Sequence, residues 1–113
     1  MKALKITATG WLQKIDVDPD RIAVEIGCAD VQSVALHYNV RLWFDTMHAC
    51  LWREPNISAA CLMINCGDHA PETAPLPCGD IILLGAGPDG TPADLTRQQY
   101  EALAYALLNS LAA

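Results

Sequence analysis

The chain has little charge and few aromatic residues, and each scarcity excludes a class of protein. Charged residues make up 18% of the 113 residues and aromatic residues 6%, whereas hydrophobic residues make up 52%. We therefore expect a thinly charged surface that leaves some apolar area for a partner or a second copy. No apolar run approaches the ~18 residues of a membrane span, and no signal-peptide segment follows Met1. These absences predict a cytoplasmic protein with no membrane partner.

Basic residues are the scarcest charged class. Thirteen Asp and Glu residues against seven Lys and Arg residues give a net charge of −6. Direct nucleic-acid binding requires a basic stripe that neutralises phosphates, so we expect no nucleic-acid partner. The acidic residues are dispersed and form no run, so the sequence also shows no phosphate-mimicking face.

The chain has five cysteines, which is an odd number and no obvious disulfide framework. Together with the missing signal peptide, this number favours reduced thiols in a cytosol. The cysteines are Cys28, Cys50, Cys61, Cys66 and Cys78.

The order of apolar patterns predicts one α+β domain spanning residues 1–113. We expect a mixed sheet of about four or five strands, with two or three helices packed mainly on one face. Strands are predicted over 2–7 and 12–17, as two strands within 31–45 joined near 37–39, and over 81–84, which is apolar on both faces and therefore central.

Two shorter helices are predicted from their end signals. Asp18 and Pro19 are a typical N-cap and first helical residue, and Gly27 suits a left-handed C-cap. Asn56 is a good N-cap for a second helix. The predicted buried stripe of that second helix, at positions i, i+3, i+4 and i+7, is Ile57, Ala60, Cys61 and Ile64.

The last helix has the clearest signals. Thr96 and Gln99 form a capping box, and an apolar stripe follows them. Tyr105 lies off the centre of this stripe and is a candidate oligomer contact. The predicted stripe is Tyr100, Leu103, Ala104, Leu107, Leu108 and Leu111.

Gly85, Gly87 and Gly90 spell G-x-G-x-x-G between a predicted strand and a predicted helix. A dinucleotide site also needs a second parallel strand with an acidic residue about 20 positions on, and the sequence offers neither. Pro88 and Asp89 also occupy the turn where a pyrophosphate needs bare N–H groups. We therefore expect no nucleotide cofactor here.

Metal and thiol chemistry form the enzyme alternative. Cys61, Cys66, His69 and Cys78 are zinc-ligand types, but their spacing fits no usual zinc knuckle. A Cys–His–Asp triad could be drawn from Cys66 or Cys78 with His69 and Asp68, yet a proline-rich loop offers no rigid geometry for it. We predict no catalytic residues and no resident metal or cofactor.

The segment from Arg41 to Asn56 is the predicted binding site. Two indoles, two guanidiniums and His48 fall within it, and such groups stack on nucleotides, bind phosphate or anchor protein interfaces. In the structural alternative, the tryptophans cover a sheet edge while the arginines pair with Asp45 and Glu54. The predicted binding residues are Arg41, Trp43, Trp52, Arg53 and Asn56.

Short sequence motifs in the chain resemble those of an uncharacterised small-domain family that is common in bacteriophages and bacterial mobile elements. The resemblance implies a phage or prophage accessory protein inside a bacterium, with no catalytic residues to transfer. The matching motifs are Lys2-Ala3-Leu4, Leu42-Trp43-Phe44-Asp45, Asn56 with Ala59-Ala60, Gly79-Asp80 with Gly85, and Asp94-Leu95-Thr96.

This resemblance and the Trp/Arg segment lead to a binding function rather than an enzyme. The expected role is an anti-defence inhibitor, whose partner is a bacterial defence protein or a small nucleotide messenger. The alternatives are a small metal- or thiol-dependent enzyme and a homo-oligomeric structural subunit.

Overall fold

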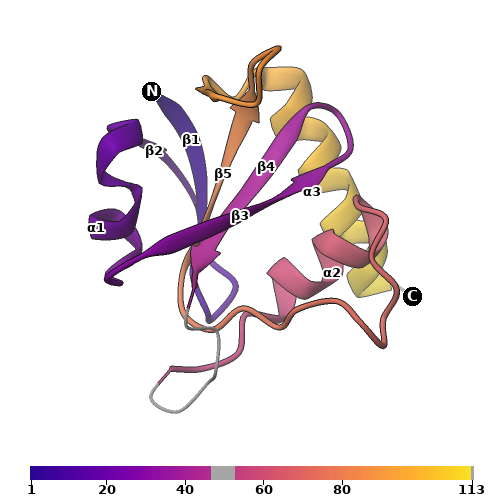
Figure 1. Ribbon diagram of the computed structural model, residues 1–113. Coiled ribbons are helices and arrows are strands. Elements are labelled where there is room, and N and C mark those ends of the chain that lie inside the picture. Colours follow the sequence, from indigo (N-terminus) through magenta and orange to yellow (C-terminus); the bar gives the residue numbers. More distant parts are fainter. Residues whose placement is uncertain (47–52, 113) are drawn as a thin grey trace.

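Apolar runs of the sequence form the strands of one β-sheet (Figure 1). The structure is a computed structural model that describes residues 1–46 and 53–112. Within the described residues, three α-helices and one short 3-10 helix accompany the sheet, so the predicted α+β class is confirmed. The strands are β1 (Lys2–Ile6), β2 (Leu12–Asp16), β3 (Val31–Leu36), β4 (Val40–Asp45), β5 (Ile81–Ala86) and β6 (Pro92–Ala93).

The sheet has the strand order β2-β1-β5-β4-β3, with β6 paired to β5. Each of these pairs is antiparallel, so the expectation of a mixed sheet is wrong. The reason is that tight turns join β1 to β2 and β3 to β4, and such turns connect only antiparallel strands. Tyr38 and Asn39 both adopt positive φ in the second turn, as a tight hairpin requires.

Strand β5 supplies the centre of both hydrophobic cores. Its residues Ile81 to Leu84 are all fully buried and alternate between the two faces of the sheet. Ile81 and Leu83 belong to one core, and Ile82 and Leu84 belong to the other. The sequence prediction of a central strand is therefore confirmed.

Helices cover the two faces unequally (Figure 1). Helices α2 (Ile57–Asn65) and α3 (Arg97–Ala112) pack on the larger core, and α2 contributes Leu62 and Met63 to it. The short segments η1 (Pro19–Arg21) and α1 (Ile22–Ile26) cover the smaller core. No described helix has the length and apolar content needed to cross a bilayer.

The predicted signals at the ends of the first helical segment are confirmed. The Asp18 side chain accepts a hydrogen bond from the Asp20 N–H, and Pro19 opens η1. Gly27 ends α1 with φ of 82°, the left-handed conformation that glycine adopts without steric cost.

Helix α2 begins where predicted but is rotated relative to the predicted stripe. Asn56 is its N-cap, as expected. Its buried residues are Ala59, Leu62 and Met63, whereas Ile57 is 61% exposed. Because α2 is apolar nearly all round, its periodicity could not select the buried face, and packing on the sheet decides it.

Helix α3 has the predicted capping box. The Gln99 N–H donates to the Thr96 hydroxyl at 3.1 Å, and the Gln99 side chain accepts from the Thr96 N–H at 2.9 Å. Leu103 and Leu107 are buried as predicted, but Leu108 is 65% exposed, so the predicted stripe is too wide.

The glycine-rich motif from Gly85 to Gly90 lies in a β-hairpin rather than at a strand-to-helix turn. Strand β5 pairs antiparallel with β6 through Gly85 and Ala93. A Cβ at Gly85 would lie 2.7 Å from the Asp94 carbonyl oxygen, so this glycine permits close approach of two backbones. The Thr91 side chain and N–H donate to Asp89 and lower its pKa, which keeps negative charge in the turn. The motif therefore forms a turn between two antiparallel strands and does not open a helix.

Asn56 provides the first testable prediction. The residue is fully buried; its oxygen accepts from the Ala59 N–H, and its NH2 donates to the Ile6 and Gly79 carbonyls at 3.1 and 2.9 Å. We expect Asn56→Ala to lower the free energy of unfolding by about 3 kcal/mol. The substitution removes the N-cap of α2 and leaves two carbonyl groups without this hydrogen-bond donor. Urea unfolding measures this loss. Gln98→Ala, on the exposed side of α3, is the control, and a loss below about 1 kcal/mol for Asn56→Ala would contradict the assignment.

Candidate functional site

The predicted Arg/Trp segment is engaged in internal contacts wherever the structure describes it. Arg41 lies on β4, and its guanidinium donates to the Ser33 hydroxyl at 3.0 Å and to the Ser33 carbonyl at 3.4 Å. Ser33 lies on the neighbouring strand β3, across from Trp43. Arg41 therefore ties two strands together.

Arg53 is similarly engaged. Its guanidinium lies 3.3 Å from the carboxylate of Asp45, which is 9% exposed, and it also donates to the Gly27 carbonyl. This is the pairing of an arginine with Asp45 that the structural alternative predicted. Arg53 links the end of β4 to the end of α1.

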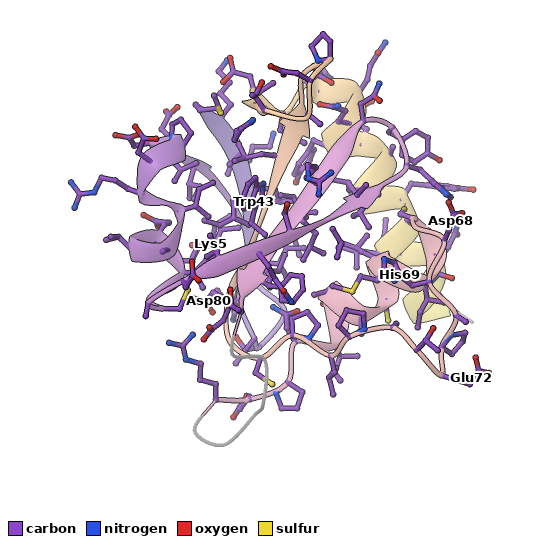
Figure 2. All side chains as sticks on the ribbon, in the orientation of Figure 1. Lys5, Trp43, Asp68, His69, Glu72 and Asp80 are labelled. Atoms are coloured by element: carbon purple, nitrogen blue, oxygen red, sulfur yellow. The ribbon has the colours of Figure 1, made fainter. Side chains whose placement is uncertain are left out.

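Trp43, labelled in Figure 2, packs against the smaller core. Its side chain is half-buried, and its indole Nε1 is a buried donor that finds no acceptor among the described residues. Trp52 and His48, the other ring residues of the predicted site, lie outside the described residues. The structure therefore brings Trp43, Arg41 and Arg53 onto the α1 side of the sheet, where each makes contacts within the fold.

Asn56 and Asp80 also serve the fold. Asn56 uses its side chain on three backbone partners and is fully buried, so it is not available to a ligand. The Asp80 carboxylate accepts from the Ala8 N–H at 3.2 Å and lies 3.6 Å from the Lys5 ammonium (Figure 2). Lys5 also pairs with Glu25 of α1 at 3.4 Å.

The cysteines do not assemble into the zinc set considered from the sequence. Cys28, Cys61 and Cys66 are free thiols, whereas Cys78 is disulfide-bonded. The expectation that all thiols are reduced is therefore wrong for Cys78. Among the described residues, no three His, Cys, Asp or Glu side chains gather as metal ligands would.

The Asp68–His69 part of the imagined triad is also not assembled. Asp68 pairs instead with His37, with 3.2 Å between its carboxylate and Nε2, and both side chains are largely exposed. Figure 2 shows Asp68, His69 and Glu72 spread along the loop after α2. Cys66 is buried in the larger core.

A groove of about 590 Å³ lies between the edge strand β2, the start of β1 and the N-terminal end of α3. Basic side chains from all three elements line it, together with one aromatic ring. Its acidic lining residues are Asp16 and Asp94. The basic and aromatic lining residues are Lys2, Lys14, Arg97 and Tyr100. We call this site the β2–α3 groove.

Contacts within the groove fix its side chains. The Lys14 ammonium lies 4.3 Å from the centre of the Tyr100 ring, a cation–π distance. Arg97 pairs with Glu101 one turn later at 3.0 Å. The Lys2 N–H donates to the Asp94 carboxylate at 2.8 Å, so that acid is already engaged.

The charge of the groove differs from that of the whole protein. Three of the seven basic residues line it, although the net charge of the chain is −6. The N-terminal end of α3 adds a partial positive charge to the same place. The lining thus carries three basic side chains against the two acidic side chains of Asp16 and Asp94.

The sequence contained a weak signal for this groove. Arg97 opens a helix where acidic residues are favoured by the helix dipole, and the first turn of α3 contains no acid. The juxtaposition of Lys14 and Tyr100 could not be predicted from the sequence, because only the packing of α3 against β2 brings them together.

A second groove, of about 480 Å³, lies between α2 and α3. Its lining residues carry no formal charge and include Tyr38, Cys61 and Tyr105. Tyr105 is exposed, in keeping with its predicted position off the helix stripe.

Comparison with known proteins assigns the chain to no family. No family model matches it, and neither the curated proteins nor the solved structures include a detectable match. The function must therefore be argued from the site itself.

The free thiols provide a prediction. Burial raises the pKa of the Cys66 thiol, so less thiolate is present at pH 8 than for an ordinary cysteine. Cys66 is also buried, whereas Cys61 is only partly covered. We expect iodoacetamide to alkylate Cys61 well before Cys66 in the folded protein, as peptide mapping by mass spectrometry would measure. The alkylation rates of the two cysteines in urea serve as the reference. Equal alkylation rates of Cys61 and Cys66 in the folded protein would contradict the burial of Cys66.

Proposed function

We propose that the protein acts by binding an acidic partner in the β2–α3 groove. The observation that supports this most directly is the gathering of Lys2, Lys14 and Arg97 around one groove in a protein of net charge −6. With three basic and two acidic side chains, the groove has a small local excess of positive charge, which favours an anionic partner. The proposal moves the binding site from the Arg/Trp segment to the other face of the sheet.

The chemistry of the groove supports binding rather than catalysis. The Thr96 hydroxyl accepts from Gln99, and the Asp94 carboxylate accepts from Lys2, so both groups stabilise the fold. Apart from the Asp16 carboxylate, the remaining charged groups are two ammonium groups and the guanidinium of Arg97, which pairs with Glu101. These groups recognise carboxylates and phosphates through charge-assisted hydrogen bonds. We therefore propose a binding protein, not an enzyme, with no resident cofactor.

A protein partner fits the groove better than a nucleotide messenger. Lys14 already lies over the ring of Tyr100, where a nucleotide base would stack. Trp11 is 72% exposed beside β2, and exposed tryptophans are frequent anchors of protein interfaces. A nucleotide messenger is the alternative that the experiment below separates.

The biological setting of this proposal comes from the resemblance to a phage and mobile-element family. In that setting the partner is a bacterial defence protein, and the role is anti-defence inhibition in the host cytoplasm. The Cys78 disulfide is an observation against a cytoplasmic setting, because disulfides persist mainly in oxidising compartments. The groove proposal does not depend on the compartment.

Titration with defined anions tests the groove. We expect poly-L-glutamate to shift the backbone amide NMR signals of Lys14, Thr96 and Arg97. The double variant Lys14→Gln/Arg97→Gln should bind about tenfold more weakly, because two exposed charged contacts of about 0.7 kcal/mol each are lost.

The matched control is Arg21→Gln, which removes an exposed basic residue of η1 on the other side of the sheet. An equal loss of affinity in this control would show that only overall charge matters and would refute the groove. Binding of ATP but not of poly-L-glutamate would replace the protein partner with a nucleotide.

A further inference from the structure

Strand β2 is an open edge of the sheet. The Val17 N–H donates to the Met1 carbonyl and the Thr7 N–H to the Trp11 carbonyl, each at 2.9 Å. These bonds mark the odd-numbered residues of the β2 segment as the ones whose backbone faces β1, because hydrogen-bonded and non-hydrogen-bonded pairs alternate.

The even-numbered residues of β2 therefore direct their backbone groups away from the sheet. These residues are Leu12, Lys14 and Asp16. No described residue makes a hydrogen bond to their N–H or C=O groups. All three residues are exposed. The edge thus offers the row of backbone groups that an added strand requires.

The opposite edge, β3, is covered in comparison. The Asp30 side chain accepts from the Val31 N–H at 3.1 Å, and the Arg41 guanidinium donates to the Ser33 carbonyl. Just beyond β3, the His37 N–H donates to the Cys66 carbonyl at 2.6 Å. Side chains and a loop thus occupy backbone positions on this edge.

The open edge and the groove are adjacent. Lys14 belongs to both: its backbone lies on the free edge, and its side chain projects over Tyr100 into the groove. A peptide strand beside β2 would place every second side chain against the groove, because side chains alternate between faces. On the other face, its side chains would neighbour Ile15 and Trp11.

We propose that the partner contributes an extended segment that adds to β2 as a further strand, with acidic residues at alternate positions facing Lys14 and Arg97. This inference rests on the proposed function and specifies how the partner binds. Backbone hydrogen bonds would supply affinity, and charge complementarity with the groove would select acidic side chains. Apolar residues at the intervening positions would contact Trp11 and Ile15.

A capped hexapeptide that alternates Glu and Val is the probe. We expect it to bind the unmodified protein, with shifts along β2 and at the start of α3, and the Lys/Val counterpart not to bind. Two further peptides carry N-methyl groups on either all Glu or all Val residues. Only one of them should lose affinity, by tenfold or more, because alternate N–H groups face β2.

A protein variant provides an independent test. Leu12→Pro removes an N–H that faces away from β1, so it leaves the β1–β2 hydrogen bonds intact but blocks an added strand. We expect this variant to bind the Glu/Val peptide at least tenfold more weakly. Leu12→Ala, which keeps the N–H, should bind like the unmodified protein. Circular dichroism and thermal unfolding verify that both variants fold.

The outcomes separate the two levels of the proposal. If neither N-methylated peptide loses affinity and Leu12→Pro binds normally, strand addition is refuted. In that case, weaker binding by Lys14→Gln/Arg97→Gln would still support the groove as the binding site. If that double variant also binds normally, both proposals fail. Light scattering tests for a dimer that Leu12→Pro abolishes. Such a dimer would show that a second copy of the chain occupies the β2 edge, and it would refute the proposal of a partner segment there.

Discussion

Burial of β5 on both faces is the constraint on which the rest of the fold depends. A strand whose residues from Ile81 to Leu84 are all fully buried needs a hydrogen-bonded neighbour on each side and a cover on each face. Strands β1 and β4 provide the neighbours, α2 and α3 cover one face, and the short η1–α1 segment covers the other. The two covers differ in size. The smaller one leaves polar contacts such as Lys5–Asp80 and Arg53–Asp45 to complete that face.

Local signals predicted much of this architecture because they act within a few residues of one another. The Asp18-Pro19 start, the Gly27 end and the Thr96–Gln99 capping box each depend on the geometry of a single turn, and all three are present. The pairing of β5 with β1 and β4, and the buried face of α2, were not predictable in this way. Helix α2 is apolar on nearly every side, so only its contact with the sheet decides that Met63 is buried and Ile57 is not.

The same difference between local signals and contacts of distant residues applies to the candidate site. Counting aromatic and basic residues along the chain indicated the segment from Arg41 to Asn56, but proximity in sequence does not show which groups are already engaged. Ser33 engages Arg41, Asp45 engages Arg53, and three backbone groups engage Asn56. The groove that gathers Lys2, Lys14 and Arg97 is assembled from residues far apart in the chain, because β1, β2 and α3 each contribute to its lining. Arg97 is a cation at a helix start, which is an unusual position that the sequence itself contains.

The difference between the two sheet edges limits the size of any assembly built through the backbone. Fibre-like stacking requires each molecule to present two bare edges, so that every addition creates a new place for the next. Here Asp30, Arg41 and the Cys66 carbonyl blunt the β3 side, while the β2 side stays bare. Growth would therefore stop after one event, with either a single foreign strand or a closed pair. If a segment adds to β2 as proposed, the same asymmetry would favour one bound segment per chain over an open-ended polymer.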